Sequence, residues 1–108
     1  MNVAKRESAI VVRRDLLALP SSYVSPRSVT ESKLAEIWRD CLSLDCVGIH
    51  DDYETLGGDS FLAAIIFTQI EAEFKVSLPM ATLVEAPTIE QLAAKLEAAM
   101  HKAGWRSA

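Results

Sequence analysis

The sequence is poor in cysteine and histidine, with two of each among 108 residues. Cys41 and Cys46 do not form a C-x-x-C pair, and neither His50 nor His101 has a pair of further ligands near it. We therefore expect no metal site. Two unpaired structural cysteines are typical of a reducing compartment, so we expect a cytoplasmic location.

Long apolar segments are also missing. The longest one near the N-terminus covers residues 9–12, and two arginines follow it instead of a cleavage site. The apolar segment that begins at Phe61 is much shorter than a bilayer requires. We therefore expect neither a signal peptide nor a membrane partner.

Clustered positive charge is absent as well. The formal net charge is −4, the sequence pI is near 5.1, and no basic stripe with interleaved aromatic residues occurs. This pattern argues against nucleic acid as a partner.

No segment alternates for long in the manner of a strand, whereas helical periodicity recurs along the chain. Residues 30–44, 60–75 and 88–102 have apolar residues at helical spacing, and residues 80–85 allow one or two further turns before Pro87. The first and last of these helices begin with the spacing of a capping box, S-x-x-E from Ser28 and T-x-x-Q from Thr88. The predicted fold is all-α, an antiparallel four-helix bundle of three longer helices and one short helix.

A long loop separates the first two predicted helices. It ends at Ser60 and contains four apolar residues, Val47, Ile49, Tyr53 and Leu56. A loop of this length in a small helical domain is either functional or disordered. The apolar residues favour an ordered loop that is anchored to the bundle and holds the turn before Ser60.

The two ends of the chain differ from the middle. Residues 1–27 show no sustained period, so we interpret them as an N-terminal extension or linker that is dispensable for folding. Residues 28–102 form the predicted domain, and residues 103–108, which begin just before Gly104, form a C-terminal tail. We expect this single domain to be a monomer.

The turn at residues 56–60, Leu-Gly-Gly-Asp-Ser, is the most distinctive stretch. Gly57 and Gly58 leave the backbone free to take positive φ angles. Asp59 and Ser60 then precede a helical pattern and offer N-cap chemistry. Ser60 should therefore lie in the first turn of a helix, where the helix dipole suits an attached phosphate. The dipole contributes only ~0.3–1 kcal/mol, which favours covalent attachment over reversible binding.

These residues carry a resemblance to a known family. The segments 51–53 (Asp-Asp-Tyr), 56–60 and 85–89 (Glu-Ala-Pro-Thr-Ile), in that order and with a hydrophobic helix between the last two, resemble a peptidyl carrier protein of nonribosomal peptide synthesis. Such carriers belong to the wider acyl carrier family, and the resemblance covers about residues 29–100. Glu54 and Phe61 depart from the commonest pattern, which puts partner choice in doubt more than modification. Residues 15–20 are also similar to linkers that join adenylation domains to carriers.

The resemblance implies a function and a set of partners. Ser60 would receive a covalent 4′-phosphopantetheine arm from coenzyme A, and Gly58 and Asp59 would form the attachment turn around it. The arm would carry aminoacyl, peptidyl or acyl groups as thioesters. The implied partners are a phosphopantetheinyl transferase, an adenylating loading enzyme, and a downstream condensation, thioesterase or tailoring enzyme. The carrier itself would perform no catalysis.

Two other readings of Ser60 remain. The Gly-Asp-Ser sequence also occurs at the nucleophile of one esterase family, but only His50 and His101 could provide the imidazole base that such a serine needs. The second alternative is a small helical interaction module in which Ser60 is only a helix N-cap. For Asp59, a capping role and a role in docking the modifying enzyme are equally open.

Phe61 and Ile65 lie one turn apart on the predicted helix, away from its apolar core face and next to Ser60. A small bundle cannot easily cover a helix on both sides, so we expect both side chains to be exposed. Together with Met80 and Leu83 they would form an apolar docking patch for partner enzymes.

Overall fold

The computed structural model describes residues 10–102, and within them all regular structure except one isolated bridge is helical. The elements are the 3-10 helix η1 (Arg14–Leu17) and the α-helices α2 (Val29–Leu42), α3 (Ser60–Phe74), α4 (Thr82–Glu85) and α5 (Ile89–Lys102). These bounds agree with the predicted helices to within two residues at each end. The predictions for residues 1–9 and for the tail 103–108 lie outside the described residues.

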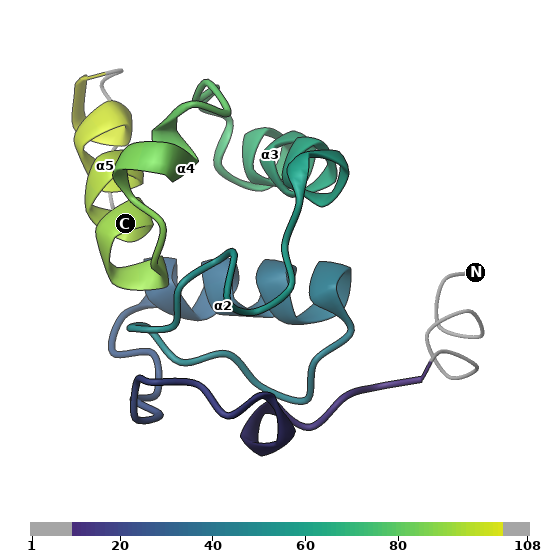
Figure 1. Ribbon diagram of the computed structural model, residues 1–108. Helices are drawn as coiled ribbons and strands as arrows, with labels where there is room; N and C mark the ends of the chain where they lie inside the picture. The colour runs from purple at the N-terminus through teal and green to yellow at the C-terminus, as the bar shows by residue number, and fades with distance from the viewer. Residues whose placement is uncertain (1–9, 103–108) are drawn as a thin grey trace.

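The α-helices form the predicted all-α bundle. α2 packs against both α3 and α5, and the short α4 packs against α5. Figure 1 shows α2 crossing beneath the other helices, with α3 and α4 at the top of the molecule. Within residues 10–102, no helix combines the length and the apolar content that crossing a bilayer would need.

Side-chain caps fix where the helices begin. The Ser28 hydroxyl accepts a hydrogen bond from the backbone N–H of Glu31 at 3.1 Å, and the Thr88 hydroxyl accepts one from Gln91 at 3.2 Å. Both bonds are half of the capping box that the sequence predicts. The Glu31 carboxylate does not complete its box, because it accepts instead from the backbone N–H and the guanidinium of Arg27.

The core face of α3 agrees with the predicted arc. The buried residues of this helix recur every three or four positions and are Ala63, Ile66, Phe67, Ile70 and Phe74, while Leu62 is half-buried. Each large side chain that is fully buried contributes about 1.5–3 kcal/mol relative to exposure. This face therefore holds α3 on the bundle and fixes the position of its first residue, Ser60.

Residues 10–27, here called the N-terminal strap, are not the separate arm that we expected. Leu17, Leu19 and Val24 pack against the hydrophobic core. The strap also bonds by its backbone to the loop after α2, through Val12 N–H to Ser43 O (2.8 Å) and Ile49 N–H to Val24 O (2.9 Å). In Figure 1 it runs along the bottom of the molecule, beneath that loop. Residues 10–27 show no periodic pattern because the strap packs through scattered single residues instead of one helical or strand face.

Residues 43–59, here called the site loop, join α2 to α3. All four apolar residues predicted to anchor it are buried, and Leu44 is a fifth buried apolar residue. The loop is therefore ordered, as predicted, and is held between the strap on one side and the helices on the other.

Candidate functional site

Ser60 is the first residue of α3, and its side chain is exposed. The N-cap is Asp59, whose Oδ1 accepts a hydrogen bond from the backbone N–H of Leu62 at 2.9 Å. Asp59 therefore has the capping role that we left open for it. Since Asp59 already caps α3, the alternative in which Ser60 serves only as the N-cap is wrong.

Tyr53 holds the turn in front of Ser60. Its hydroxyl donates a 2.8 Å hydrogen bond to the carbonyl oxygen of Asp59, and its backbone N–H donates to Pro87 O, also at 2.8 Å. The buried ring packs edge-on against Trp38, with 5.2 Å between ring centroids. Burial raises the pKa of the Tyr53 hydroxyl above its ordinary value of 10.0, so the group is a neutral donor at neutral pH. Tyr53 thereby ties the start of α3 to α2 and to the segment before α5.

Glycine is required at the two positions of the turn for different physical reasons. A Cβ on Gly58 would lie 2.2 Å from the Tyr53 ring, so only glycine fits under that ring. Gly57 has φ 98°, a backbone conformation that residues with a side chain rarely adopt, although a Cβ there would meet open space. Gly58 is thus needed for close packing and Gly57 for its backbone angle.

The turn before the glycines is organised by Asp52. Its Oδ2 accepts hydrogen bonds from the backbone N–H groups of Glu54 (3.0 Å) and Thr55 (3.2 Å). This Asx-type turn directs the chain back on itself, and Gly58 N–H then donates to Tyr53 O at 3.1 Å. The site loop therefore reaches Ser60 through a continuous series of local hydrogen bonds.

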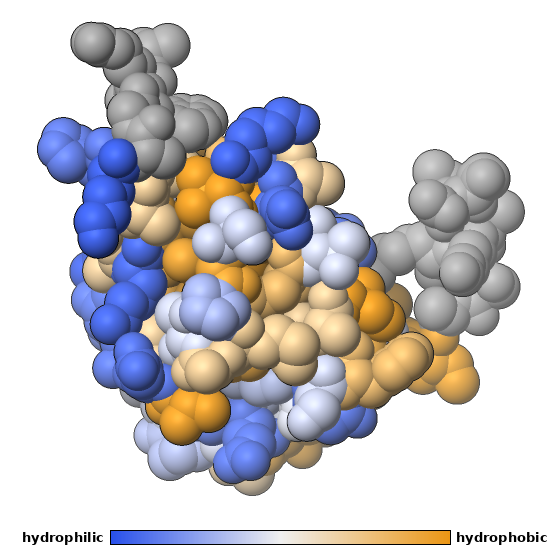
Figure 2. Space-filling view, turned by 90° about the horizontal axis from the view of Figure 1, so that it is seen from above, coloured by the Kyte–Doolittle hydropathy of each residue, from blue (hydrophilic) through white to orange (hydrophobic). Residues whose placement is uncertain are grey.

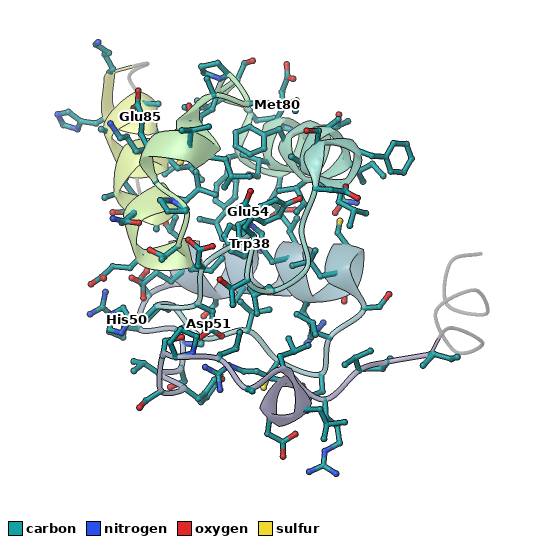
Figure 3. All side chains as sticks on the ribbon, in the orientation of Figure 1. Trp38, His50, Asp51, Glu54, Met80 and Glu85 are labelled. Atoms are coloured by element: carbon teal, nitrogen blue, oxygen red, sulfur yellow. The ribbon has the colours of Figure 1, made fainter. Side chains whose placement is uncertain are left out.

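A groove lies beside Ser60 between the site loop and α4. Its walls include Tyr53, Ser60, Ala63, Met80 and Val84. Figure 2 views the face made by α3 and α4 and shows apolar side chains across its middle. Met80 is at the top of the molecule beside α4 in Figure 3, while Trp38 lies at the centre.

The exposure expected of the four docking-patch residues is found for three of them. The exposed fractions are 74% for Phe61, 37% for Ile65 and 41% for Met80, as expected, but 8% for Leu83. Leu83 belongs to the hydrophobic core, because its side of the single turn of α4 faces the bundle. Val84, 84% exposed, lies on the outer side of that turn instead. The i, i+4 spacing of Met80 and Val84 could have identified it from the sequence.

The apolar residues also form two surfaces. Met80 and Val84 line the groove, whereas neither Phe61 nor Ile65 is among the residues that line it. Helical geometry explains this separation, since Ser60 and Ala63 share one side of α3 and Phe61 and Ile65 the other. Ser60 therefore lies between two exposed apolar surfaces.

The surroundings of Ser60 do not resemble a hydrolase triad. The groove residues include no histidine, and His50 lies 3.1 Å from the Glu90 carboxylate on α5. Among residues 10–102, no group of three or more His, Cys, Asp or Glu side chains could hold a metal ion. The groove instead offers one exposed hydroxyl beside an apolar wall.

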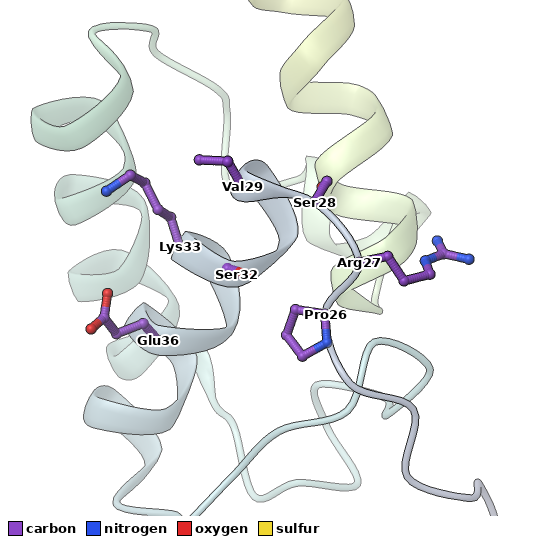
Figure 4. Close-up of a pocket in the computed structure, with 7 residues that line it drawn as sticks. All are labelled: Pro26, Arg27, Ser28, Val29, Ser32, Lys33 and Glu36. Carbon is purple, nitrogen blue, oxygen red and sulfur yellow. The ribbon is translucent and has the colours of Figure 1, made fainter.

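A second hollow, drawn in Figure 4, lies at the start of α2 between Pro26 and Glu36. It contains no residue of the site loop or of α3. The helix N-terminus there is already capped by Ser28, and Arg27 is paired with Glu31. This hollow is therefore separate from the site at Ser60.

Comparison with known proteins agrees with this geometry. The family described as "Phosphopantetheine attachment site" matches residues 32–96. Gramicidin S synthase 2 of Brevibacillus brevis is 43% identical over 81 residues, which cover 75% of this chain but 2% of that protein. The chain thus spans only a small part of its long relative.

Two solved structures share the fold. One is the solution structure of an active-site mutant of a peptidyl carrier protein, with 37% identity, a TM-score of 0.69, and coverage of 73% of this chain and 88% of that one. The other is a peptidyl carrier protein in complex with the phosphopantetheine transferase Sfp and coenzyme A, with 38% identity, a TM-score of 0.68, and coverage of 70% and 99%. The chain belongs to the phosphopantetheine-attachment family and is a peptidyl carrier domain of the nonribosomal peptide synthesis type, whose cofactor is 4′-phosphopantetheine.

Proposed function

We propose that Ser60 carries the 4′-phosphopantetheine arm and that the chain uses it to move aminoacyl or peptidyl groups between enzymes as thioesters. The observation that carries this proposal is the exposed Ser60 hydroxyl at the first position of α3, which Asp59 leaves free of the capping role. Within the family match, the serine is also preceded by the glycine turn that Tyr53 holds in place.

Attachment requires little of the carrier itself. The Ser60 Oγ attacks the pyrophosphate of coenzyme A, a new O–P bond forms, and the bond to the adenosine-containing leaving group breaks. A partner transferase supplies the base that takes the hydroxyl proton and the metal that balances the phosphate charge. The carrier contributes a rigid, accessible hydroxyl, and the start of α3 favours the attached anion.

The residues around Ser60 fit the arm. The groove next to the hydroxyl is open and has an apolar wall with Met80 and Val84 on it. Such a wall can contact the thin pantetheine chain without enclosing its cargo. The thiol that the arm supplies accepts the acyl group, so this chain does not need a substrate pocket of its own.

Partner enzymes perform the remaining chemistry in this proposal. An adenylating enzyme loads the thiol, and a condensation, thioesterase or tailoring enzyme takes the acyl group away. The transferase complex of the peptidyl carrier relative supports the first partner, a phosphopantetheinyl transferase. The chain would act as a cytoplasmic monomer and catalyse no step itself.

The two apolar surfaces beside Ser60 would dock these partners. Phe61 and Ile65 form the outer surface on α3, and Met80 and Val84 form the groove surface. Exposed apolar residues close to a reactive group are typical of contact sites for other proteins. Because the surfaces lie on either side of the hydroxyl, different partners could use them in different proportions.

Intact mass spectrometry tests the proposal. The protein is incubated with coenzyme A and a broad-specificity phosphopantetheinyl transferase, and we expect the mass of one phosphopantetheine to be added. Ser60→Ala should gain no mass, whereas the matched variant Ser77→Ala, at another exposed serine, should be modified fully. Peptide mapping that places the label on any other residue would contradict the assignment of Ser60.

A further inference from the structure

The buried carboxylate of Asp51 joins the N-terminal strap to the site loop. Asp51 is the only fully buried acidic residue among those the structure describes, at 0% exposure. Figure 3 places it on the side of the site loop that faces the strap. An isolated charge in such a position is strongly unfavourable unless it is paired and hydrogen-bonded.

Arg14 of η1 supplies that pairing. Its Nε donates to Asp51 Oδ2 and its Nη2 to Oδ1, both at 2.6 Å, which is a two-pronged arginine–carboxylate pair. Ser21 Oγ adds a 2.7 Å hydrogen bond to Oδ1, and Gly48 N–H adds one of 2.8 Å to Oδ2. Two of the three residues that bind the carboxylate therefore come from the strap.

Arg14 is itself held in place. Its side chain also donates to Ser21 O at 3.0 Å and lies over the Tyr23 ring at 5.3 Å, and its backbone N–H donates to Asp45 Oδ1 at 2.7 Å. Most of the side chain is buried. This fixed arginine can therefore hold Asp51 in one position. The tight packing around Gly48 leaves the backbone there little room to move. A Cβ there would lie 3.2 Å from Asp51 Oδ2, from the Tyr23 ring and from the Val24 nitrogen.

The constraint reaches Ser60 in short steps. Asp51 is followed by Asp52, which forms the Asx-type turn, and then by Tyr53, which bonds to Gly58 N–H and to the Asp59 carbonyl. A shift of residues 48–51 would move the base of this turn. Without Arg14, the Asp51 carboxylate would have to take up a proton or rotate toward water, and rotation would break its hydrogen bond with Gly48 N–H and release residues 48–51.

We propose that Arg14 is a positioning residue for the attachment site: acting through Asp51, the strap fixes the loop that presents Ser60 to partner enzymes. The effect of this role on the rate of modification rests on the proposed function of Ser60. Its structural consequence, a rigid turn at residues 52–59, can be measured without any modification of Ser60.

The test compares Arg14→Ala with Arg13→Ala in the full chain. Arg13 is the matched control, since it is the neighbouring arginine and its ion pair with Asp15 is exposed. Amide hydrogen exchange is measured at Gly58 and Tyr53, and at Leu96, a fully buried residue in the middle of α5, as the reference for global opening. We expect Arg14→Ala to speed exchange at Gly58 and Tyr53 more than at Leu96, and Arg13→Ala to leave all three unchanged.

The second measurement is the kinetics of phosphopantetheine addition at a temperature where each variant is folded. We expect Arg14→Ala to lower kcat roughly tenfold with a smaller change in KM, because a displaced nucleophile reacts slowly even when bound. Arg14→Lys, which keeps the charge but loses the two-pronged pairing, should restore part of the rate. Ser21→Ala should change both readouts in the same direction by less, and it keeps the test available if Arg14→Ala does not fold.

The possible results distinguish the positioning role of Arg14 from the proposed modification of Ser60. Equal acceleration of exchange at Gly58, Tyr53 and Leu96, with an unchanged rate of modification, would mean that the pair only stabilises the fold, and this would overturn the proposal. Failure of the parent protein to be modified would overturn the assignment of Ser60. The exchange data would still decide whether the strap fixes the turn.

Discussion

The hydroxyl of Tyr53 donates a 2.8 Å hydrogen bond to the carbonyl oxygen of Asp59, the residue that caps α3 and precedes Ser60. The Tyr53 ring lies directly over Gly58 and against Trp38. One buried side chain therefore connects the core of the bundle to the backbone that presents the serine. The position of Ser60 depends on this contact as much as on the cap of its own helix.

The first prediction concerns the two glycines under and beside this ring. Gly58→Ala should destabilise the protein by about 2 kcal/mol or more, because the new methyl group would overlap a ring that cannot move easily. Gly57→Ala, the matched control, should cost about 1 kcal/mol through its positive φ alone. Urea unfolding of both variants measures the difference, and a larger loss at Gly57 would contradict the packing argument.

The sequence predicted this site well in some respects and poorly in others. The apolar spacing of residues 30–102 and the two capping boxes located the helices, because those signals are local. The role of Tyr53 over Gly58 could not be derived, since it depends on how the site loop folds back over five residues. The pairing of Arg14 with Asp51 joins residues far apart in the sequence, and no local pattern reports it.

The second prediction compares the contributions to stability of Asp59, which caps α3, and of Ser60, the proposed site of modification. Asp59→Ala should cost about 1 kcal/mol, since it removes the side chain that accepts from Leu62 N–H. Ser60→Ala should change the free energy of unfolding by no more than about 0.5 kcal/mol, as expected for an exposed position without such a contact. Chemical denaturation provides both values. A loss at Ser60 as large as that at Asp59 would restore a capping role for the serine.

The third prediction reverses the expectation that residues 1–27 are dispensable for folding. Deleting them removes Leu17, Leu19 and Val24 from the edge of the core, along with both strap residues that pair with Asp51. We expect a loss of about 2 kcal/mol or more, and a melting temperature lower by roughly 10 °C. Thermal denaturation followed by circular dichroism is the measurement. A truncated protein that melts with the parent would contradict the packing of the strap.

The fourth prediction is a loss of stability in acid, caused by two carboxylates. Hydrogen bonds from Arg27 lower the pKa of Glu31 below its ordinary value of 4.5. Burial alone would raise the pKa of Asp51, but the hydrogen bonds from Arg14, Ser21 and Gly48 outweigh it and hold the pKa below the ordinary 3.8. A group whose pKa is lowered by folding contributes stability that is fully present above its unfolded-state pKa and is lost as the pH falls through its folded-state pKa.

The free energy of unfolding should therefore be nearly level from pH 7 to about pH 5 with respect to these two groups and should fall below that. Urea unfolding at a series of pH values measures the curve. Glu31→Gln provides the comparison. Its free energy of unfolding should be lower than that of the parent at pH 7, and this difference should shrink as the pH falls below about 4. A difference that stays constant down to pH 3 would show that Glu31 contributes no linked protonation.

The last prediction tests the docking surfaces beside Ser60. Phe61→Ala and Ile65→Glu alter the outer surface of α3, and Met80→Ala alters the groove surface. Because these side chains are exposed, each variant should unfold within about 1 kcal/mol of the parent. A minority of the residues at a protein interface, the hot spots, each cost more than about 1 kcal/mol of binding when truncated, and for such a residue we expect roughly a fivefold to tenfold fall in kcat/KM.

Gln69→Ala is the matched control, since it is exposed on α3 but lies more than two turns from Ser60. Each variant is assayed for modification by the transferase and for loading by an adenylating partner. If the two surfaces serve different partners, Phe61 and Met80 variants should slow these two reactions in different proportions. Full rates in both assays for every variant would mean that the apolar surfaces are not docking sites, while a variant that unfolds would instead assign its residue to the core.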